Sequence, residues 1–541
     1  MSRAALPAVV RDHPWQSAFV AAFAAVVALK LGGLGMSPPG LYADEASIGY
    51  NAWAIAHHGV DEHGNGFPVL YFQAFGEYKN PLYVYLLAPF TWVLPLTAYT
   101  VRLPAALCGI AICVLVSATA WTVTRSRAAA LAALVTAGLT PWLTLESRVG
   151  FEVPMMTLTL VVAIWCYARA WQPGASRLWL AGCSTALGAT VFAYSTGRLF
   201  AGILAGVLVV DLLLWRRRRL VDVAVPVLLA YLVFGLYAHA HPGALTSRFD
   251  ALSIGADHPG LVTEALRFLR NYATYDGVPF LFTNGDSNLR HSTGYGGVLL
   301  VTTLPLAVLG VVRCLRTWRD PVSRLLIGGL VTAPIPAALT AEGTPHALRS
   351  AAMLPFVLVV MALGWAEVLP WLTARRLLAG AVAVAIAADA GGFMWDLFVR
   401  YPGRAVTWFD TGEVAAIQTA YALAGGAHSV YISNAVDVDG VAYIQALFAL
   451  TPAPPARPED DESRPELAAI GVTVLPTAGD IASEVQPGDL MVLGPGEQAP
   501  EGSTLVDTES VTVVPDAVTL PQSSTGVSPD AHFVLARVWR R

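Results

Sequence analysis

The sequence predicts a polytopic α-helical membrane protein. We expect about eleven transmembrane helices, juxtamembrane helices in the first external loop, and a small external α/β domain at the C-terminus. Hydrophobic residues make up 55% of the 541 residues and charged residues only 13%, whereas soluble domains carry roughly 25% charged residues. Apolar runs long enough to cross a bilayer recur up to residue 395. Beyond that point the chain is less apolar and shows strand-like segments.

Twelve apolar runs are candidates for membrane helices, because about 20 apolar residues span a bilayer. No evident cleavage site follows the first run, so we expect a retained helix and not a removed signal peptide. The runs lie near residues 16–36, 82–98, 101–123, 128–145, 153–170, 177–195, 199–215, 220–239, 295–313, 322–340, 351–370 and 377–395.

The placement of arginines predicts the orientation, because cytoplasmic loops are rich in Lys and Arg. All arginine clusters fall on the cytoplasmic side only if the run at 82–98 does not cross. That run is short, proline-containing and aromatic, so we place it on the outer face as a juxtamembrane segment. Eleven spans remain, with the N-terminus inside and the C-terminus outside. The clusters are Arg125/Arg127, Arg169/Arg177, Arg216 to Arg219, Arg313/Arg316/Arg319/Arg324 and Arg375/Arg376.

Two domains follow from this topology: a transmembrane domain at residues 1–395 and an external soluble α/β domain at residues 396–541. In the second domain "SVYISNA" and "GDLMVLG" are typical of buried strands, and "GEVAAIQTAYALAGG" of a helix that ends at glycine. The stretch rich in proline and acids at residues 451–466 is expected to form a loop.

Composition excludes some functions. The net charge is −5 and basic tracts are short, which argues against nucleic acid as a partner. The five cysteines lie in or beside apolar runs without CxxC spacing, so we expect small buried hydrophobic residues and not disulfides or metal ligands. High Ala and Arg usage is weakly indicative of a GC-rich bacterial genome.

Polar residues from distant parts of the chain collect at the predicted outer face of the membrane. Ionisable groups at that depth are costly and mark functional sites by default. Cations there suit a lipid phosphate, and an acid beside them suits a general base. These residues are Asp44, Glu45, Asp61, Glu62, His63, Glu77, Lys79, Glu146, Arg148, Glu152, Arg198, Asp286, Arg290, His291, Glu342, His346 and Arg349.

The first external loop carries a family resemblance. "DEASIGYNAWAIAHHGVDEHGNGFP" followed by "GEYKNPLYVYL" resembles that loop in the polyprenyl-phosphate-dependent membrane glycosyltransferases of type C fold, which include protein O-mannosyltransferases and aminoarabinose transferases. "ESRVGFEVP", "NGDSNLRHSTGYGG" and "GTPHALRSAAMLP" are similar to prokaryotic members, and the resemblance covers roughly residues 10–395. It implies a cell-envelope hexosyl- or pentosyltransferase that moves sugar from a polyprenyl-phosphate donor to a hydroxyl of a glycan, lipid or protein acceptor. Transfer is expected on the extracytoplasmic face, with inversion of the anomeric carbon.

The resemblance implies Asp44 as the catalytic base and Lys79 as a contact of the donor phosphate. In the aminoarabinose transferases the lysine directly precedes proline, whereas one residue separates Lys79 from Pro81 here. Position in the chain adds the other candidates. These are Glu45 as a second catalytic acid; Arg148, Arg198, Arg290 and Arg349 as further phosphate ligands; and Tyr42, Glu77, His291 and His346 as substrate-binding residues.

Each candidate has a structural alternative. Asp44 and Glu45 also suit the start of a helix over "EASIGYNAWAIAHH", where acids are stabilising. Lys79 also suits a lysine at the membrane interface. The arginines could instead form ion pairs with Glu146, Glu152 or Glu342. His291 and His346 could be ordinary loop histidines whose hydrogen bonds are satisfied by the protein.

No metal site is predicted. The histidines and acids of "HHGVDEHG" lack a recognisable ligand spacing, and the cations suffice for a phosphate, so no cofactor is required and a divalent metal is only an alternative. A transporter or lipid flippase is the second interpretation, but few charges fall within the spans and no repeat is detectable. A non-catalytic glycan- or lipid-binding membrane protein is the third.

Overall fold

The computed structural model describes residues 13–75, 77–215, 220–241, 249, 252–341, 343–437, 440–456, 464–512 and 532–541. The cluster Arg216 to Arg219, Glu342 and residues 457–463 of the stretch at 451–466 lie outside the described residues. The chain forms two compact units. The first contains Met1–Gly32, Ala105–Arg148 and Glu152–Met394, and the second contains Gly33–Pro104, Val149–Phe151 and Trp395–Arg541.

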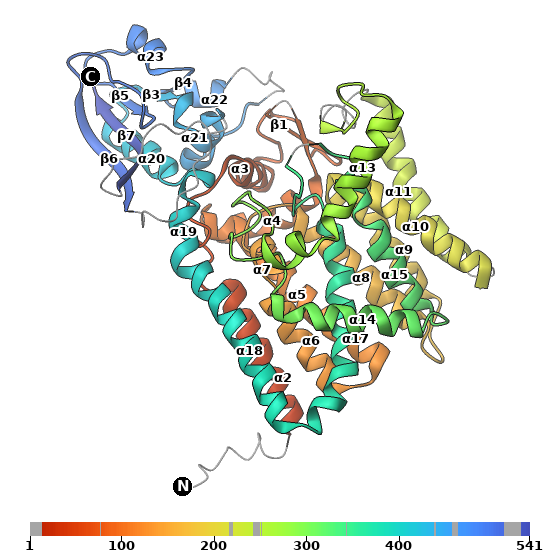
Figure 1. Cartoon of the computed structure of the whole chain (residues 1–541). Coiled ribbons are helices and arrows are strands. Elements are labelled where there is room, and N and C mark those ends of the chain that lie inside the picture. Colours follow the sequence, from red (N-terminus) through yellow and green to blue (C-terminus); the bar gives the residue numbers. More distant parts are fainter. Residues whose placement is uncertain are drawn as a thin grey trace, which may run out of the picture. The chain divides into compact units, whose positions relative to one another are not determined.

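The apolar runs of the sequence form helices (Figure 1). Eight helices among the described residues are long and apolar enough to cross a membrane, and three further apolar helices are shorter. The protein is therefore a multi-pass membrane protein. The helices are α2 (Pro14–Leu31), α4 (Pro81–Val93), α5 (Ala98–Thr124), α6 (Arg127–Leu139), α7 (Pro141–Glu146), α8 (Val153–Ala170), α9 (Leu178–Ala193), α10 (Ser195–Trp215), α11 (Leu220–Ala240), α14 (Leu304–Arg316), α15 (Pro321–Thr332), α16 (Ile335–Ala338), α17 (Leu354–Thr373) and α18 (Arg376–Trp395).

Small residues bring the helices of the first unit close together. A Cβ atom at Gly310 of α14 would lie 1.9 Å from the carbonyl oxygen of Val360 in α17. A Cβ atom at Gly364 of α17 would lie 2.1 Å from the carbonyl oxygen of Leu306. Only glycine allows the two backbones to approach this closely, as is common where helices pack inside a membrane.

Helix boundaries depart from the apolar runs where glycine or proline interrupts them. The run at 295–313 stays irregular through its glycines until the 3₁₀ turn η3 (Val301–Thr303) leads into α14. The run at 322–340 breaks near Pro334 into α15 and α16. The loop at 240–294, which is predicted to be external, contains a helix that the sequence analysis did not predict, α13 (Leu261–Tyr275), followed by the π-helix η2 (Pro279–Thr283).

The second unit combines the first loop with the C-terminal part of the chain. The first loop forms α3 (Ala43–His58), an antiparallel hairpin of β1 (Phe72–Ala74) and β2 (Glu77–Lys79), and α4. The C-terminal part begins with the short helical turns η5 (Asp396–Arg400), α19 (Tyr401–Arg404) and η6 (Val406–Trp408).

A five-stranded sheet with helices around it follows (Figure 1). The strand order is β4-β3-β5-β7-β6. Strand β3 runs parallel to β4 and β5, whereas β7 runs antiparallel to β5 and β6. The elements are α20 (Glu413–Ala424), β3 (Val430–Ser433), η7 (Asn434–Val436), α21 (Ala442–Leu450), α22 (Pro465–Ala468), β4 (Val472–Leu475), α23 (Ala478–Glu484), β5 (Leu490–Leu493), β6 (Thr504–Thr512) and β7 (His532–Arg540).

The predicted fold class is confirmed. Strands β3 and β5 coincide with the two predicted strands, and α20 ends at Gly425, whose φ of 57° lies in the left-handed region. The five cysteines are buried and free, as expected.

Because the five native cysteines are buried, a cysteine introduced at an exposed position can be labelled selectively to test the membrane topology. We expect Ser483→Cys, on exposed α23, to react with a membrane-impermeant maleimide in intact cells, because the C-terminal domain is predicted outside. Ser176→Cys, in the exposed turn between α8 and α9, is expected to react only after permeabilisation. The reverse pattern would overturn the predicted orientation.

Candidate active site

Helix α3 presents the predicted base in its first turn. Asp44 and Glu45 are the acids of that turn, where the helix dipole favours negative charge, and the helix ends at Gly59 with a φ of 74°. The residue before the helix, Tyr42, makes no side-chain cap. Instead, a carboxylate oxygen of Asp410 accepts a hydrogen bond from the Ala43 N–H at 3.1 Å. An acid from far along the chain therefore accepts a hydrogen bond from a backbone N–H that has no partner within the helix.

Glu45 is held inside the protein by Arg102. Nε and one terminal nitrogen of Arg102 donate to the two carboxylate oxygens of Glu45, each at 2.8 Å, and both side chains are 0% exposed. The Gly150 N–H donates to the same carboxylate at 2.7 Å. Arg102 also donates to three carbonyl oxygens of the chain before α3, those of Leu34, Pro38 and Gly40.

These contacts change the role we give to Glu45. A carboxylate without exposed surface and occupied by three donors does not contact a substrate. We therefore assign Glu45 to holding the loop in place, not to catalysis. The sequence analysis did not select Arg102, although a single arginine inside the apolar run at 101–123 was a signal of a buried partner.

Asp44 faces the other way and meets Lys79. The two side chains form an ion pair in which Asp44 is 31% exposed and Lys79 is 10% exposed. Lys79 stands at the end of β2, opposite Phe72 of β1, and α4 begins two residues later at Pro81. The Lys79 ammonium also lies 4.9 Å from the centre of the Phe75 ring. The first loop thus brings a partly exposed acid and a cation together.

The two other candidates of this loop are placed differently. Tyr42 is buried, and its ring stacks on Phe151 at 5.5 Å between centroids and meets Phe409 edge-on at 5.7 Å. This packing fixes the approach to α3 and leaves Tyr42 no surface for a substrate. The backbone of Glu77 pairs with Ala74 in the hairpin, and its side chain lies outside the described residues.

Arg148 caps a helix. Its guanidinium is 0% exposed and donates to the carbonyl oxygens of Leu29 at 2.9 Å and Gly32 at 2.8 Å, at the C-terminal end of α2. Cations at this end satisfy the last carbonyls of a helix. We therefore assign Arg148 to helix capping and no longer to the donor phosphate. Arg198 is partly buried in the first turn of α10 and lies 5.3 Å from the ring centre of Phe234.

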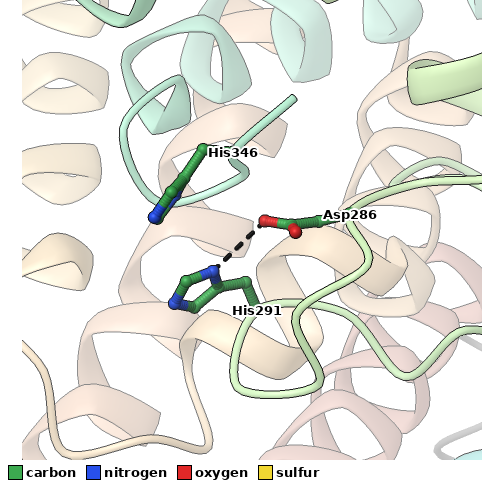
Figure 2. Close-up of side chains that lie close together, drawn as sticks. All are labelled: Asp286, His291 and His346. Atoms are coloured by element: carbon green, nitrogen blue, oxygen red, sulfur yellow. Dashed lines mark hydrogen bonds and ion pairs between the residues drawn. The ribbon is translucent and has the colours of Figure 1, made fainter. Parts of the chain in front are cut away.

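A second polar cluster gathers in the first unit (Figure 2). Asp286 and His291 come from one loop and His346 from another, and one ligand atom from each lies within 4.8 Å of the others. Nδ1 of His291 lies 3.2 Å from the Asp286 carboxylate, and the ring centres of His291 and His346 lie 4.4 Å apart. Arg290 and Arg349 adjoin this cluster in sequence and are partly exposed.

The Asp286 carboxylate is fixed by backbone donors. The N–H groups of Asn288 and Ala347 donate to it at 2.9 and 2.8 Å. Burial alone would raise the pKa of Asp286, but the hydrogen bond and charge of His291, together with these backbone donors, lower it below its usual value. The carboxylate is therefore ionised at neutral pH. Burial raises the pKa of the nearby Tyr275 to about 12, so that side chain is a neutral phenol.

The histidine and acid side chains of the stretch at 57–64 do not gather at one site. Asp61 accepts hydrogen bonds from the N–H groups of His63 and Asn65 and so closes its own turn. His57 stacks on Trp53 with 5.1 Å between ring centres. Among the described residues the histidines and acids grouped closely enough for a metal are those of the second cluster.

Comparisons with solved structures identify the fold. ArnT from Cupriavidus metallidurans in the apo state superposes with a TM-score of 0.56, at 16% identity, over 90% of this chain and 94% of that chain. The same protein bound to undecaprenyl phosphate gives a TM-score of 0.53 at 15% identity, over 89% of this chain and 93% of that chain.

The chain has the type C fold. The oligosaccharyltransferase of Archaeoglobus fulgidus in its apo form is also similar, with a TM-score of 0.51 at 14% identity, over 81% of this chain and 64% of that chain. The sequence matches no family model and no curated protein. These matches confirm the fold predicted from the first-loop motifs, although the sequence is only 15–16% identical to ArnT.

The buried pair of the first loop gives a stability prediction. We expect Arg102→Ala to destabilise the protein by about 3–5 kcal/mol, because it leaves the Glu45 charge buried without a partner. Thermal unfolding of the full chain in detergent would measure the loss. Replacing both residues by apolar ones, Arg102→Met with Glu45→Leu, is expected to recover most of it.

A surface pair provides the control for this measurement. Arg267 and Asp257 form a bidentate ion pair with side chains 39% and 62% exposed. Arg267→Ala is expected to leave the unfolding temperature unchanged within error. Equal shifts for Arg102→Ala and Arg267→Ala would contradict the structural role assigned to the buried pair.

Proposed function

We propose that this protein is a glycosyltransferase that moves a sugar from a polyprenyl-phosphate donor to an acceptor hydroxyl on the extracytoplasmic face of the membrane. The observation that carries the proposal is the pairing of a partly exposed Asp44 with Lys79, on a loop fixed by a buried ion pair. Among proteins of similar fold, ArnT is bound to undecaprenyl phosphate in one solved structure, which supports a lipid phosphate as the donor here.

Asp44 is suited to act as the general base. Its carboxylate is partly exposed and sits on a rigid helix whose adjacent residue is anchored by Arg102. A carboxylate in the first turn of a helix can take a proton from a hydroxyl placed within hydrogen-bond reach. Holding that base on a helix rather than on a mobile loop keeps it at a defined distance from the bound acceptor.

Lys79 is suited to exchange partners. In the structure its ammonium contacts Asp44. The phosphate of the donor is a diester with one negative charge, and it gains a second as its bond to the anomeric carbon breaks, so it would draw the ammonium toward itself as the reaction proceeds. Asp44 then loses its cation and becomes the stronger base at the step where the acceptor is deprotonated, while Lys79 stabilises the phosphate that leaves.

The chemical step balances with these two residues. The acceptor oxygen forms a bond to the anomeric carbon from the face opposite the phosphate, and the bond from that carbon to the phosphate oxygen breaks with its electron pair on the phosphate. Asp44 receives the hydroxyl proton. The products are the glycosylated acceptor, with inverted configuration, and the polyprenyl phosphate.

Four further residues are proposed as donor or acceptor ligands. Arg290 and Arg349 offer guanidinium groups of the type that binds phosphate, and His291 and His346 stand beside them in the same two loops. Arg198 is proposed as an additional phosphate ligand. The acceptor is proposed to be a glycan, lipid or protein of the cell envelope, and the external α/β domain to contribute to its binding.

Removal of the base gives the decisive test. Asp44→Asn is expected to lower transfer by about 10²–10⁴-fold, because an amide cannot take the hydroxyl proton. The measurement is transfer of radiolabelled sugar from mannosyl- and arabinosyl-polyprenyl phosphates to a cell-envelope extract by the chain in nanodiscs. Asp257→Asn, at an exposed acid of the first unit, is the control and is expected to keep full activity. Full activity of Asp44→Asn, or no transfer by the wild type, would refute the proposal.

Substitution of the cation separates binding from catalysis. Lys79→Met keeps the length of the side chain and removes its charge, so we expect the KM for the donor to rise and kcat to fall as well. Binding of the polyprenyl phosphate product, measured by its competition with the donor, is expected to weaken by at least about tenfold, since a charge-assisted hydrogen bond is worth roughly 1.5–3 kcal/mol. Unchanged competition would assign Lys79 to the structure of the loop.

A further inference from the structure

Helix α21 of the C-terminal domain packs against α3, the helix that carries Asp44 (Figure 1). The buried ring of Phe448 lies so close that a Cβ atom at Gly49 would be 2.8 Å from it. Just beyond α21, the carbonyl oxygen of Pro452 accepts a hydrogen bond from the Tyr50 hydroxyl at 2.8 Å. The helix of the proposed base is therefore held by a segment that lies 402 residues further along the chain.

Gln445 of α21 fastens the start of α3 from inside the protein. It is 0% exposed, and its amide donates to the carbonyl oxygen of Leu41 at 2.9 Å and to the carboxylate of Asp410 at 3.4 Å. The same Asp410 oxygen accepts the hydrogen bond from the Ala43 N–H. One amide thus binds the chain before α3 directly and the first residue of α3 through Asp410.

Tyr443, near the start of α21, reaches the hairpin that carries Lys79. Its ring meets the ring of Phe75 edge-on, with 6.1 Å between the centroids. The Phe75 ring in turn lies 4.9 Å from the Lys79 ammonium. The guanidinium of Arg464 lies 3.9 Å from the centre of the Tyr443 ring. A cation therefore contacts each member of an aromatic pair, and Lys79 is linked to the C-terminal domain through that pair.

The backbone of Phe75 is strained. Its φ of 58° lies in the left-handed region, which a bulky side chain seldom adopts. Strain of this kind persists only where the surrounding structure over-determines the conformation, and it is concentrated at functional sites. The ring of Tyr443 supplies one of the contacts that hold Phe75 in place. A change at Tyr443 is therefore expected to reach Lys79 through Phe75.

One short helix makes both sets of contacts. Helix α21 has nine residues, and residues two apart on an α-helix, such as Tyr443 and Gln445, point about 200° apart. One of these side chains reaches the hairpin of Lys79, and the other reaches the start of α3. The spacing between the proposed base and the proposed phosphate ligand therefore depends on α21.

We propose that Gln445 and Tyr443 are positioning residues of the glycosyltransferase site. Gln445 sets the direction of Asp44 through the start of α3. Tyr443 sets the position of the Lys79 ammonium through Phe75. The inference rests on the proposed function, and it gives the C-terminal domain a part in the chemical step besides the binding of the acceptor. Because neither residue touches a substrate in this role, its loss acts only through Asp44 or Lys79.

Removal of the Gln445 amide tests the first half of the proposal. Gln445→Met keeps the length of the side chain and loses both hydrogen bonds. We expect kcat for sugar transfer by the full chain in nanodiscs to fall roughly 10- to 100-fold, because a small misplacement of a catalytic group is this costly. The KM for the mannosyl- or arabinosyl-polyprenyl phosphate is expected to stay unchanged, since Lys79 keeps its contacts. Gln418→Met is the matched control and is expected to keep the wild-type kcat, because the exposed Gln418 donates to Ala449 at the far end of α21.

Binding of undecaprenyl phosphate, measured by competition with the donor, tests the second half. Tyr443→Ala is expected to weaken this competition by about two- to tenfold, the scale of one aromatic pair. Tyr443→Phe keeps the ring and is expected to compete as the wild type does, as is Tyr421→Ala, at a partly buried tyrosine of α20. In a chain that carries Lys79→Met, Tyr443→Ala is expected to cause no further loss, because a residue that acts only through Lys79 has nothing left to position.

The possible outcomes distinguish this inference from the proposed function. Transfer by the wild type together with an unchanged kcat of Gln445→Met, or unchanged competition in Tyr443→Ala, would overturn the inference alone. So would a defect of Tyr443→Ala that is as large without Lys79 as with it, or one that extra acceptor extract relieves, since either identifies Tyr443 as a direct ligand. Tyr443 is partly exposed, so its variants keep the test valid if Gln445→Met does not fold, as judged by gel filtration. No transfer by the wild type would refute the proposed function and this inference with it.

Discussion

The buried ion pair of Glu45 and Arg102 is the constraint on which the first loop depends. Two charges without solvent exposure are tolerated only when each is paired and its remaining hydrogen-bonding groups are occupied. Arg102 meets this requirement with carbonyls of the chain before α3, and Glu45 meets it with the Gly150 N–H. Successive helical residues point about 100° apart. Fixing Glu45 inward therefore directs Asp44, its neighbour, outward.

Several charged residues predicted near the outer face bind other parts of the protein. Glu45 pairs with Arg102, and Arg148 donates to the last carbonyls of α2. In a chain with so few charges, this use follows from the cost of unsatisfied backbone groups where water is scarce. The candidates that keep exposed or convergent polar atoms are Asp44, Lys79, the partly exposed Arg198, Arg290 and Arg349, and the cluster of Asp286, His291 and His346.

The sequence predicted elements and their type well, because apolar length and strand composition are local signals. The helical runs, strands β3 and β5, and the acid in the first turn of α3 were predicted correctly. It did not predict partners, because Arg102 lies 57 residues from Glu45 and Asp410 lies 367 residues from Ala43. A list of charges at one depth does not say which charge neutralises which. For the same reason the sequence analysis predicts Glu45 as a catalytic acid and Arg148 as a phosphate ligand, and it does not predict the contact between His291 and His346.

The ion pairs of Glu45 with Arg102 and of Asp44 with Lys79 use different cations. Arginine binds a carboxylate through a rigid, bidentate fork, which suits the permanent contact with Glu45. Lysine is a single charge on a flexible stem and binds without a fixed geometry, which suits a contact with Asp44 that opens in the proposed mechanism. Arginine at position 79 would compete with the proton for the same carboxylate oxygens throughout the reaction. A fixed pair inside and a pair that can open at the surface thus agree with the mechanism we propose, in which Asp44 is the base and Lys79 contacts the phosphate.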